Sequence, residues 1–231
     1  TSLMDPLTAK VQELGGEIRL GTAVTQLSRH EDSWQIHTAD KTISTKHVIL
    51  ATDPDNARKL VEGSPDLADD VASGEGDFYW PEGRETAVVR LWFSRLPNAK
   101  SGAEGGILSG EFIIDNYFWL DRIQDQYREW SRETKGSALE VHLYGPPRIL
   151  AQPDTMLLAR VITDVQSAFP ELRGHIVHQQ LQRNTVNHTL FGVGPAGQHL
   201  SIETPWSNIF CCGDWVYDPA PSFFLERATF T

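Results

Sequence analysis

The chain has 231 residues, of which 40% are hydrophobic and 22% charged, and its formal net charge at pH 7 is −11. These proportions are typical of a globular protein with one large domain or two smaller ones. The acidic charge argues against a nucleic acid partner, which would need a basic surface. It also provides no polybasic patch for anionic lipids.

No window of the sequence approaches the roughly 20 apolar residues of a membrane-spanning helix. The first residues, TSLMDPLTAK, lack the basic region and apolar run of a signal peptide. The first residue is Thr, and the last residues read as a helix that has barely begun. We therefore expect the native chain to extend beyond both ends.

The two cysteines, Cys211 and Cys212, are adjacent, which disfavours a disulfide because the ring would be strained. Free thiols favour a reducing compartment. Their apolar surroundings also disfavour reactive thiolates. The eight histidines show no spacing typical of metal ligands, so the sequence predicts no metal site.

Apolar residues at helical spacing predict a first helix over residues 3–14, which Gly15 and Gly16 end. Residues 17–46 alternate apolar and polar side chains in short stretches, a pattern that predicts small antiparallel strands. The continuous apolar run at 48–51 favours instead a strand covered on both faces, as in a parallel sheet.

The middle of the chain mixes helices and strands. Helical patterns occupy 53–72 with interruptions, 121–132 and 154–169, and strand patterns occupy 86–93, part of 110–120, 138–144 and 176–181. Residues 97–110 and the GVGPAG stretch at 192–197 read as loops. The second of these follows no clear strand and opens no helix, so it fails as a dinucleotide-binding motif. A second continuous apolar strand is predicted at 209–212.

The two buried-type strands lie far apart in sequence, with antiparallel strands and helices between them. This order predicts a mixed α/β (α+β) chain in which a nucleotide-binding type of domain is interrupted by a second domain. We predict that residues 1–55 and 186–231 form the first domain and that residues 56–185 form the second.

Gly213 and Asp214 directly follow the second apolar strand. Ligands bind outside the carboxyl ends of strands in open α/β sheets, where a glycine lets the backbone come close and a carboxylate can accept hydrogen bonds from sugar hydroxyls. The alternative is a plain strand-to-turn transition in which the aspartate caps the next element. Further along, Pro221 and Ser222 read as a helix start, and Glu226 fits stabilisation of its first turn through the helix dipole.

Several stretches together resemble a known superfamily. A helix ending in Gly-Gly, the strand EIRLGTAVTQL, a strand ending VILAT, and CCGDWVYDPAPSFFLERA near the end resemble flavin-dependent amine oxidases and phytoene-desaturase-like enzymes. The LEVHLYG and VVRLWF strands are more similar to the carotene desaturases of the aromatic-carotenoid branch. The resemblance covers most of the chain and implies an FAD cofactor. It also implies that the first domain is an incomplete FAD-binding Rossmann-like domain and that the second is a substrate domain with an antiparallel sheet and helices.

The resemblance also implies site residues. The backbone at Ala23 and Val24 would meet the adenine end of FAD, and Ala51 and Thr52 would lie near the cofactor at the end of their strand. Gly213 and Asp214 would hold the pyrophosphate and ribityl chain. The helix start would lie near the isoalloxazine ring, and it corresponds to Glu226, Arg227 and Ala228. No catalytic residue is assigned.

The chain departs from the family pattern in two respects. It contains no N-terminal GxGxxG motif, and Arg227 stands where the family has a glycine. Three functions therefore remain open: the C-terminal portion of an FAD-dependent enzyme that desaturates or isomerises a carotenoid; a flavin-free relative that serves as a binding or assembly subunit of a membrane complex, for instance a photosynthetic one; and an amine or porphyrinogen oxidase.

The substrate class implies the expected location. An apolar carotenoid or isoprenoid partitions into lipid, so we expect peripheral contact with a membrane through an apolar patch of the middle domain. The expected place is the cytoplasmic face of a thylakoid or plasma membrane, with a further protein partner if the chain serves a complex.

Overall fold

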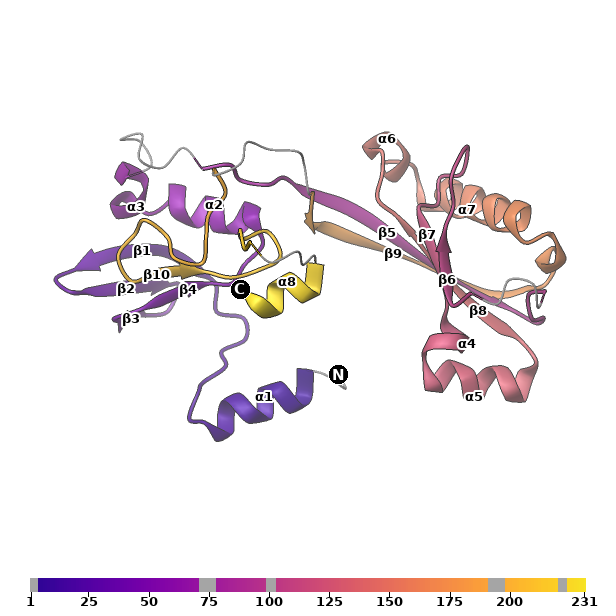
Figure 1. The fold of residues 1–231 in the computed structure, drawn as a ribbon, viewed down its shortest axis with the longest axis horizontal. Helices are drawn as coiled ribbons and strands as arrows, with labels where there is room; N and C mark the ends of the chain where they lie inside the picture. The colour runs from indigo at the N-terminus through magenta and orange to yellow at the C-terminus, as the bar shows by residue number, and fades with distance from the viewer. Residues whose placement is uncertain (1–3, 71–77, 99–102, 191–197, 220–223) are drawn as a thin grey trace. The chain divides into compact units, whose positions relative to one another are not determined.

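The computed structural model describes residues 4–70, 78–98, 103–190, 198–219 and 224–231 (Figure 1). The chain has the expected mixed α/β fold, with antiparallel sheets, helices and one parallel strand pair. It divides into two compact units. Unit 1 comprises Thr1–Pro81 and Phe191–Thr231, and unit 2 comprises Glu82–Leu190.

The boundary between the units lies later than the sequence suggested, after residue 81 rather than after residue 55. The reason is that helices α2 (Pro54–Glu62) and α3 (Pro65–Asp70) pack on strand β1 (Val24–His30) of unit 1. Ser64, between the two helices, accepts a hydrogen bond of 2.9 Å from the backbone N–H of Leu27 in β1. The second boundary follows residue 190 rather than 185.

Unit 1 contains a small antiparallel sheet in the order β1-β2-β3, in which β2 is Ser33–Thr38 and β3 is Thr42–Thr45. Its helix α1 (Met4–Glu13) has no buried side chain. The antiparallel strands that the sequence predicted are present in this sheet, but the first of them begins at Val24. Ile18 and Leu20 precede the first strand and are exposed.

Strand β4 (Val48–Leu50) pairs in parallel with β10 (Ile209–Cys211), as the two apolar runs predicted. One face of the pair packs into the core of unit 1, because Val48, Leu50, Ile209 and Cys211 are all buried. The expectation of cover on both faces is wrong for the described residues, since the side chain of Ile49 is 65% exposed.

Unit 2 is built on a five-stranded antiparallel sheet (Figure 1). The strand order is β6-β7-β8-β5-β9, with β5 Gly83–Phe93, β6 Gly105–Ile107, β7 Asn116–Trp119, β8 Ser137–Leu143 and β9 Ile176–Thr189. Helix α7 (Asp154–Ala168) packs its buried residues Leu157, Val161 and Val165 into the same core as the apolar face of β5 and β8. The remaining elements of unit 2 are short: α4 Leu120–Ile123, α5 Asp125–Thr134, α6 Pro147–Leu150 and the 3-10 helix Pro170–Leu172.

Two strands of unit 2 differ from the sequence prediction. Strand β6 forms inside the expected loop 97–110, where Gly105 and Gly106 gave no strand signal, because it pairs with β7. Strand β9 continues to Thr189 rather than ending at Leu181. Its second half, QRNTVNHT, is polar, and its pairing with β5 defines it as a strand. The GVGPAG loop prediction lies outside the described residues.

Candidate functional site

The carboxyl ends of β4 and β10 lie side by side in unit 1, because the two strands are parallel and adjacent. The Cys212 N–H donates to the Leu50 carbonyl oxygen at 3.0 Å. Beyond the strands, the Trp215 indole N–H donates to the Thr52 carbonyl oxygen at 2.9 Å. Two segments about 160 residues apart in sequence are thereby held together where they leave the sheet.

Gly213 has a conformation that favours glycine. Its φ is +138°, and a Cβ atom there would lie 3.0 Å from Trp215 Nε1 and 3.2 Å from Trp215 Cδ1. The Gly213 N–H donates to Thr231 Oγ1 at 3.0 Å. Gly213 therefore allows the chain to turn tightly beside the end of β4.

An open groove with a volume of about 760 Å³ lies at the end of β4. Four of the residues predicted to contact a cofactor line it: Ala23, Val24, Ala51 and Thr52. The fold thus joins two stretches that the sequence analysis singled out separately. The volume is within the roughly 300–1,000 Å³ that is typical of sites for organic ligands.

The groove also contains residues that the sequence analysis missed: Thr22, Thr25, Asp53, Asn56, Lys59 and Leu60. Asp53 is the N-cap of α2, and its carboxylate accepts from the Asn56 backbone N–H at 3.0 Å and from its side-chain amide at 2.7 Å. The sequence signal was Asp53 followed by Pro54, a helix start directly after the VILAT strand. Helix α2 therefore brings its first turns to the strand end.

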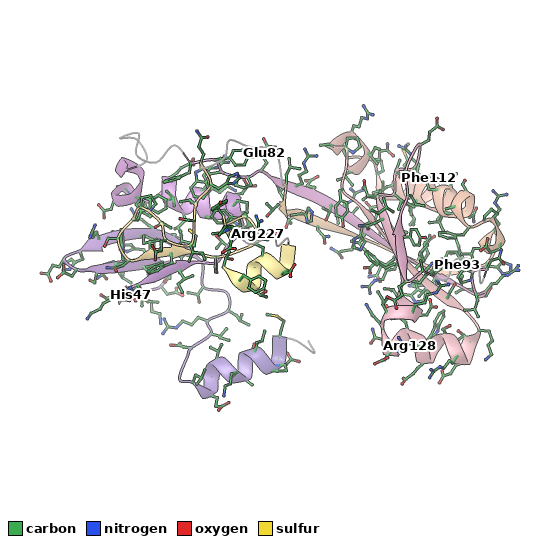
Figure 2. The ribbon with its side chains drawn as sticks, in the orientation of Figure 1. His47, Glu82, Phe93, Phe112, Arg128 and Arg227 are labelled. Carbon is green, nitrogen blue, oxygen red and sulfur yellow. The ribbon has the colours of Figure 1, made fainter. Side chains whose placement is uncertain are left out.

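The remaining predicted residues lie near this edge but do not line the groove. A Cβ at Gly213 would be 4.0 Å from the Thr52 carbonyl oxygen, and Asp214 is half-buried next to it. Glu226, Arg227 and Ala228 belong to α8 (Phe224–Phe230), and Figure 2 labels Arg227 there. Thr231, which follows α8, also donates its hydroxyl to the Gly213 carbonyl oxygen at 3.1 Å. The predicted helix start at Pro221 and Ser222 lies outside the described residues.

The polar groups of the groove suit a ligand with hydroxyl and phosphate groups. Threonine hydroxyls and the Asn56 amide can exchange hydrogen bonds with a sugar, and the Lys59 ammonium can attract a phosphate.

Burial, and after it the neighbouring Cys212, raises the pKa of the Cys211 thiol to about 12. Cys211 is therefore not a nucleophile. Within the described ranges, no group of three or more His, Cys, Asp or Glu residues could hold a metal ion.

Comparison with known proteins identifies relatives over almost the whole chain. The family model described as "Flavin containing amine oxidoreductase" matches residues 2–230. The carotenoid phi-ring synthase of Streptomyces griseus is 27% identical over 98% of this chain and 43% of its own length. The carotenoid phi-ring synthase of Chlorobaculum tepidum is also 27% identical, over 80% of this chain and 28% of its own length. The chain thus spans less than half the length of these curated relatives.

Solved structures share the fold at low sequence identity. An oxidoreductase from Methanosarcina mazei matches 97% of this chain and 50% of its own, with a TM-score of 0.65 and 17% identity. A putative protoporphyrinogen oxidase from Exiguobacterium sp. 255-15 matches 92% of this chain and 47% of its own, with a TM-score of 0.62 and 16% identity. Cyclohexylamine oxidase from Brevibacterium oxydans IH-35A matches 90% of this chain and 44% of its own, with a TM-score of 0.62 and 11% identity.

Proposed function

The chain belongs to the flavin-containing amine oxidoreductases, and on that premise we propose that it is part of an FAD-dependent oxidoreductase acting on a carotenoid or related isoprenoid. One observation carries the cofactor proposal. The groove at the end of β4 joins Ala23 and Val24 with Ala51 and Thr52, and the parallel pairing of β4 with β10 brings Gly213 to the same edge.

In this proposal FAD would lie along the carboxyl ends of β4 and β10. The exposed backbone at Ala23 and Val24 would hold the adenine end, and Lys59 would offset phosphate charge. Gly213 and Asp214 would hold the pyrophosphate and ribityl chain, with Glu226, Arg227 and Ala228 near the ring system. The chemistry that FAD would supply here is acceptance of a hydride, and the residues of this edge would bind and orient the cofactor.

The substrate class rests on the curated relatives, both of which are carotenoid phi-ring synthases. A carotenoid is an apolar polyene that resides in lipid, so we further propose that the protein contacts a membrane peripherally. The proposed place is the cytoplasmic face of a thylakoid or plasma membrane. Within the described part of the chain, no helix has the length and apolar character needed to cross a bilayer.

The rival proposal is a flavin-free relative that binds or assembles a membrane complex, and an absorption spectrum separates the two. We expect the protein extracted from its native source to show the visible bands of a bound flavin, which mass spectrometry of the released cofactor identifies as FAD. A flavin-free spectrum would contradict the oxidoreductase proposal and favour the rival. Turnover of an amine or a porphyrinogen, with none of a carotenoid, would contradict the substrate class alone.

The groove itself is tested by a pair of threonine substitutions on exposed residues of unit 1. Thr52→Arg would place a long side chain in the groove, whereas Thr42→Arg places the same side chain on β3, outside it. We expect the flavin content after purification to fall at least about tenfold in Thr52→Arg and to stay unchanged in Thr42→Arg, because the arginine would overlap with part of the space that the ligand needs. Equal flavin content in both variants would contradict the assignment of the groove.

A further inference from the structure

The second face of the unit 2 sheet carries a row of polar side chains along β8. Leu139, Val141 and Leu143 point into the core, so Glu140 and His142 point to the opposite face, and Tyr144 directly follows the strand. These residues are the polar half of the LEVHLY stretch, to which the proposed oxidoreductase function gives no role.

The three polar side chains form a continuous hydrogen-bonded chain. His142 Nε2 lies 3.0 Å from Glu140 Oε1, and His142 Nδ1 lies 3.1 Å from the Tyr144 hydroxyl oxygen. Arg90 lies on β5, opposite Glu140 of β8, and pairs with the second oxygen of that carboxylate. Its Nη1 lies 3.2 Å from the hydroxyl oxygen of Tyr127 on α5. Both oxygens of Glu140 are therefore engaged.

The direction of the hydrogen bonds follows from the charge of Glu140. The hydrogen bond from His142 lowers the pKa of this carboxyl, partial burial opposes that shift, and the bond from Arg90 adds to it. An ionised carboxylate only accepts, so His142 Nε2 carries the proton in the neutral ring. Nδ1 is then an acceptor and Tyr144 donates to it. In this order the carboxylate orients the imidazole, and the imidazole accepts a hydrogen bond from the hydroxyl. The same arrangement activates hydroxyl oxygens in many enzymes.

The Asn116 side-chain amide of β7 also donates to the Tyr144 hydroxyl oxygen, at 3.3 Å. That bond would stabilise negative charge on the oxygen if its proton moved to His142. The ring of Tyr144 stacks on His188 of β9, with centroids 5.1 Å apart, and this contact fixes its position. Phe118 of β7 lies against His142 with centroids 5.4 Å apart.

A hollow with a volume of about 240 Å³ lies beside Tyr144. Its lining includes the apolar side chains of Pro147, Leu150 and Val186. It also includes three charged residues, of which Glu82 and Glu85 are exposed and Arg84 is half-buried. The apolar side chains and the Arg84 guanidinium, a hydrogen-bond donor, suit a small uncharged ring that carries an oxygen acceptor, and the two carboxylates disfavour an anionic ligand. All of these residues belong to unit 2.

We propose that Glu140, His142 and Tyr144 form a proton-transfer site for a neutral cyclic ligand with a carbonyl group, bound in the hollow beside Tyr144. The C–H bond next to the carbonyl breaks, and its electron pair stays on the ligand as an enolate whose oxygen accepts from Arg84. The proton goes to the Tyr144 oxygen while the phenol proton passes to His142 Nδ1. Glu140 stabilises the resulting imidazolium, and reversal of these transfers returns a proton to carbon.

This activity is an addition to the proposed oxidoreductase function. It needs no oxidant and no flavin, because no electrons leave the ligand. A protein without flavin would still show it, and a flavoprotein could lack it, so the failure of one proposal is distinguishable from the failure of the other.

The test uses cyclohexanone as the probe and follows exchange of its α-hydrogens for deuterium in D₂O by proton NMR. We expect the full chain to accelerate exchange over buffer. We expect Tyr144→Phe to lower that acceleration at least about tenfold, since a positioned base typically contributes roughly 10²–10⁴-fold. The matched control Tyr217→Phe removes an exposed hydroxyl from unit 1 and should leave the rate unchanged. Unchanged exchange in Tyr144→Phe, or no acceleration by the wild-type chain, would overturn the proposal.

Glu140 acts through His142, so its variant needs a second readout. In ¹⁵N NMR of histidine-labelled protein, we expect the neutral His142 ring to be protonated at Nε2 in the wild type and to become a mixture of tautomers in Glu140→Gln, with exchange slowed in parallel. Circular dichroism confirms that the variants remain folded. A Glu140→Gln variant with the same tautomer and rate as the wild type would remove Glu140 from the site.

Discussion

Gly213 shows how one residue governs the end of two strands. Its φ of +138° disfavours any other residue, and so does the short distance of 3.0 Å that an added Cβ atom would have to Trp215 Nε1. We expect Gly213→Ala to lower the free energy of unfolding by about 1–3 kcal/mol, measured by urea denaturation. Gly110→Ala is the matched control, because Gly110 also has a positive φ, +101°, but a Cβ there meets nothing within 4 Å. Equal losses would show that the contact with Trp215 has no cost.

Cys211 illustrates the effect of burial on a single ionisable group. An unfolded cysteine thiol ionises at about pH 8.5, whereas the pKa of about 12 keeps the Cys211 thiol of the folded state protonated at that pH. In a Cys212→Ser background we expect iodoacetamide at about pH 8 to label Cys211 far more slowly than in denaturant. The unfolded state also loses this proton first as the pH rises, so the thiol's contribution to stability falls between about pH 8.5 and 12. Rapid labelling of the folded chain would contradict the burial of this residue.

At the scale of elements, the hydrogen bond from Trp215 to the Thr52 carbonyl oxygen joins the segments that leave β4 and β10. We expect Trp215→Phe to cost about 1 kcal/mol more unfolding free energy than Trp206→Phe, measured by thermal or urea denaturation. Trp206 is equally buried, but within the described part of the chain its indole N–H has no hydrogen-bond partner. The two substitutions therefore remove similar volumes and differ in one hydrogen bond. A smaller loss for Trp215→Phe than for Trp206→Phe would contradict this account.

The elements that the sequence predicted well are those with a strong hydrophobic period. Strand β8 alternates buried leucines and valine with polar residues, and helix α7 repeats apolar residues at helical spacing, so both were predicted within a few residues. Strand β6 and the second half of β9 were missed because glycines and polar residues carry no such period. Pairing with β7 and β5 makes them strands.

At the scale of the whole molecule, each unit has a hydrophobic core of its own. The core of unit 2, which includes Phe93, Trp119 and Leu157, contains buried residues from 87 to 172 alone. The Leu190 N–H donates to the Glu82 carbonyl oxygen at 2.9 Å, so the two ends of unit 2 are adjacent. Such a segment has the properties of an independent domain.

We therefore expect a protein consisting of residues 82–190 to fold by itself. Circular dichroism should show a single cooperative thermal transition, and the NMR spectrum should show dispersed amide signals. A Leu139→Ala variant of this fragment, which removes a fully buried side chain, should melt at a lower temperature because such a substitution costs about 2–5 kcal/mol. A fragment with no cooperative transition would show that unit 2 depends on the rest of the chain.

The sequence by itself determined the mixed α/β class, the two apolar strands far apart in the chain and the Gly-Asp that follows the second, because hydrophobic period and glycine placement are local properties. The resemblance to the flavin-dependent superfamily came from the same short motifs, and the family comparison confirmed it. The tertiary structure alone decided that α2 and α3 belong to unit 1, that Asp53, Asn56 and Lys59 join the groove, and that Glu140, His142 and Tyr144 meet in one hydrogen-bonded chain. These outcomes depend on strand pairing, helix packing and side-chain contacts in three dimensions, which no local pattern in the chain specifies.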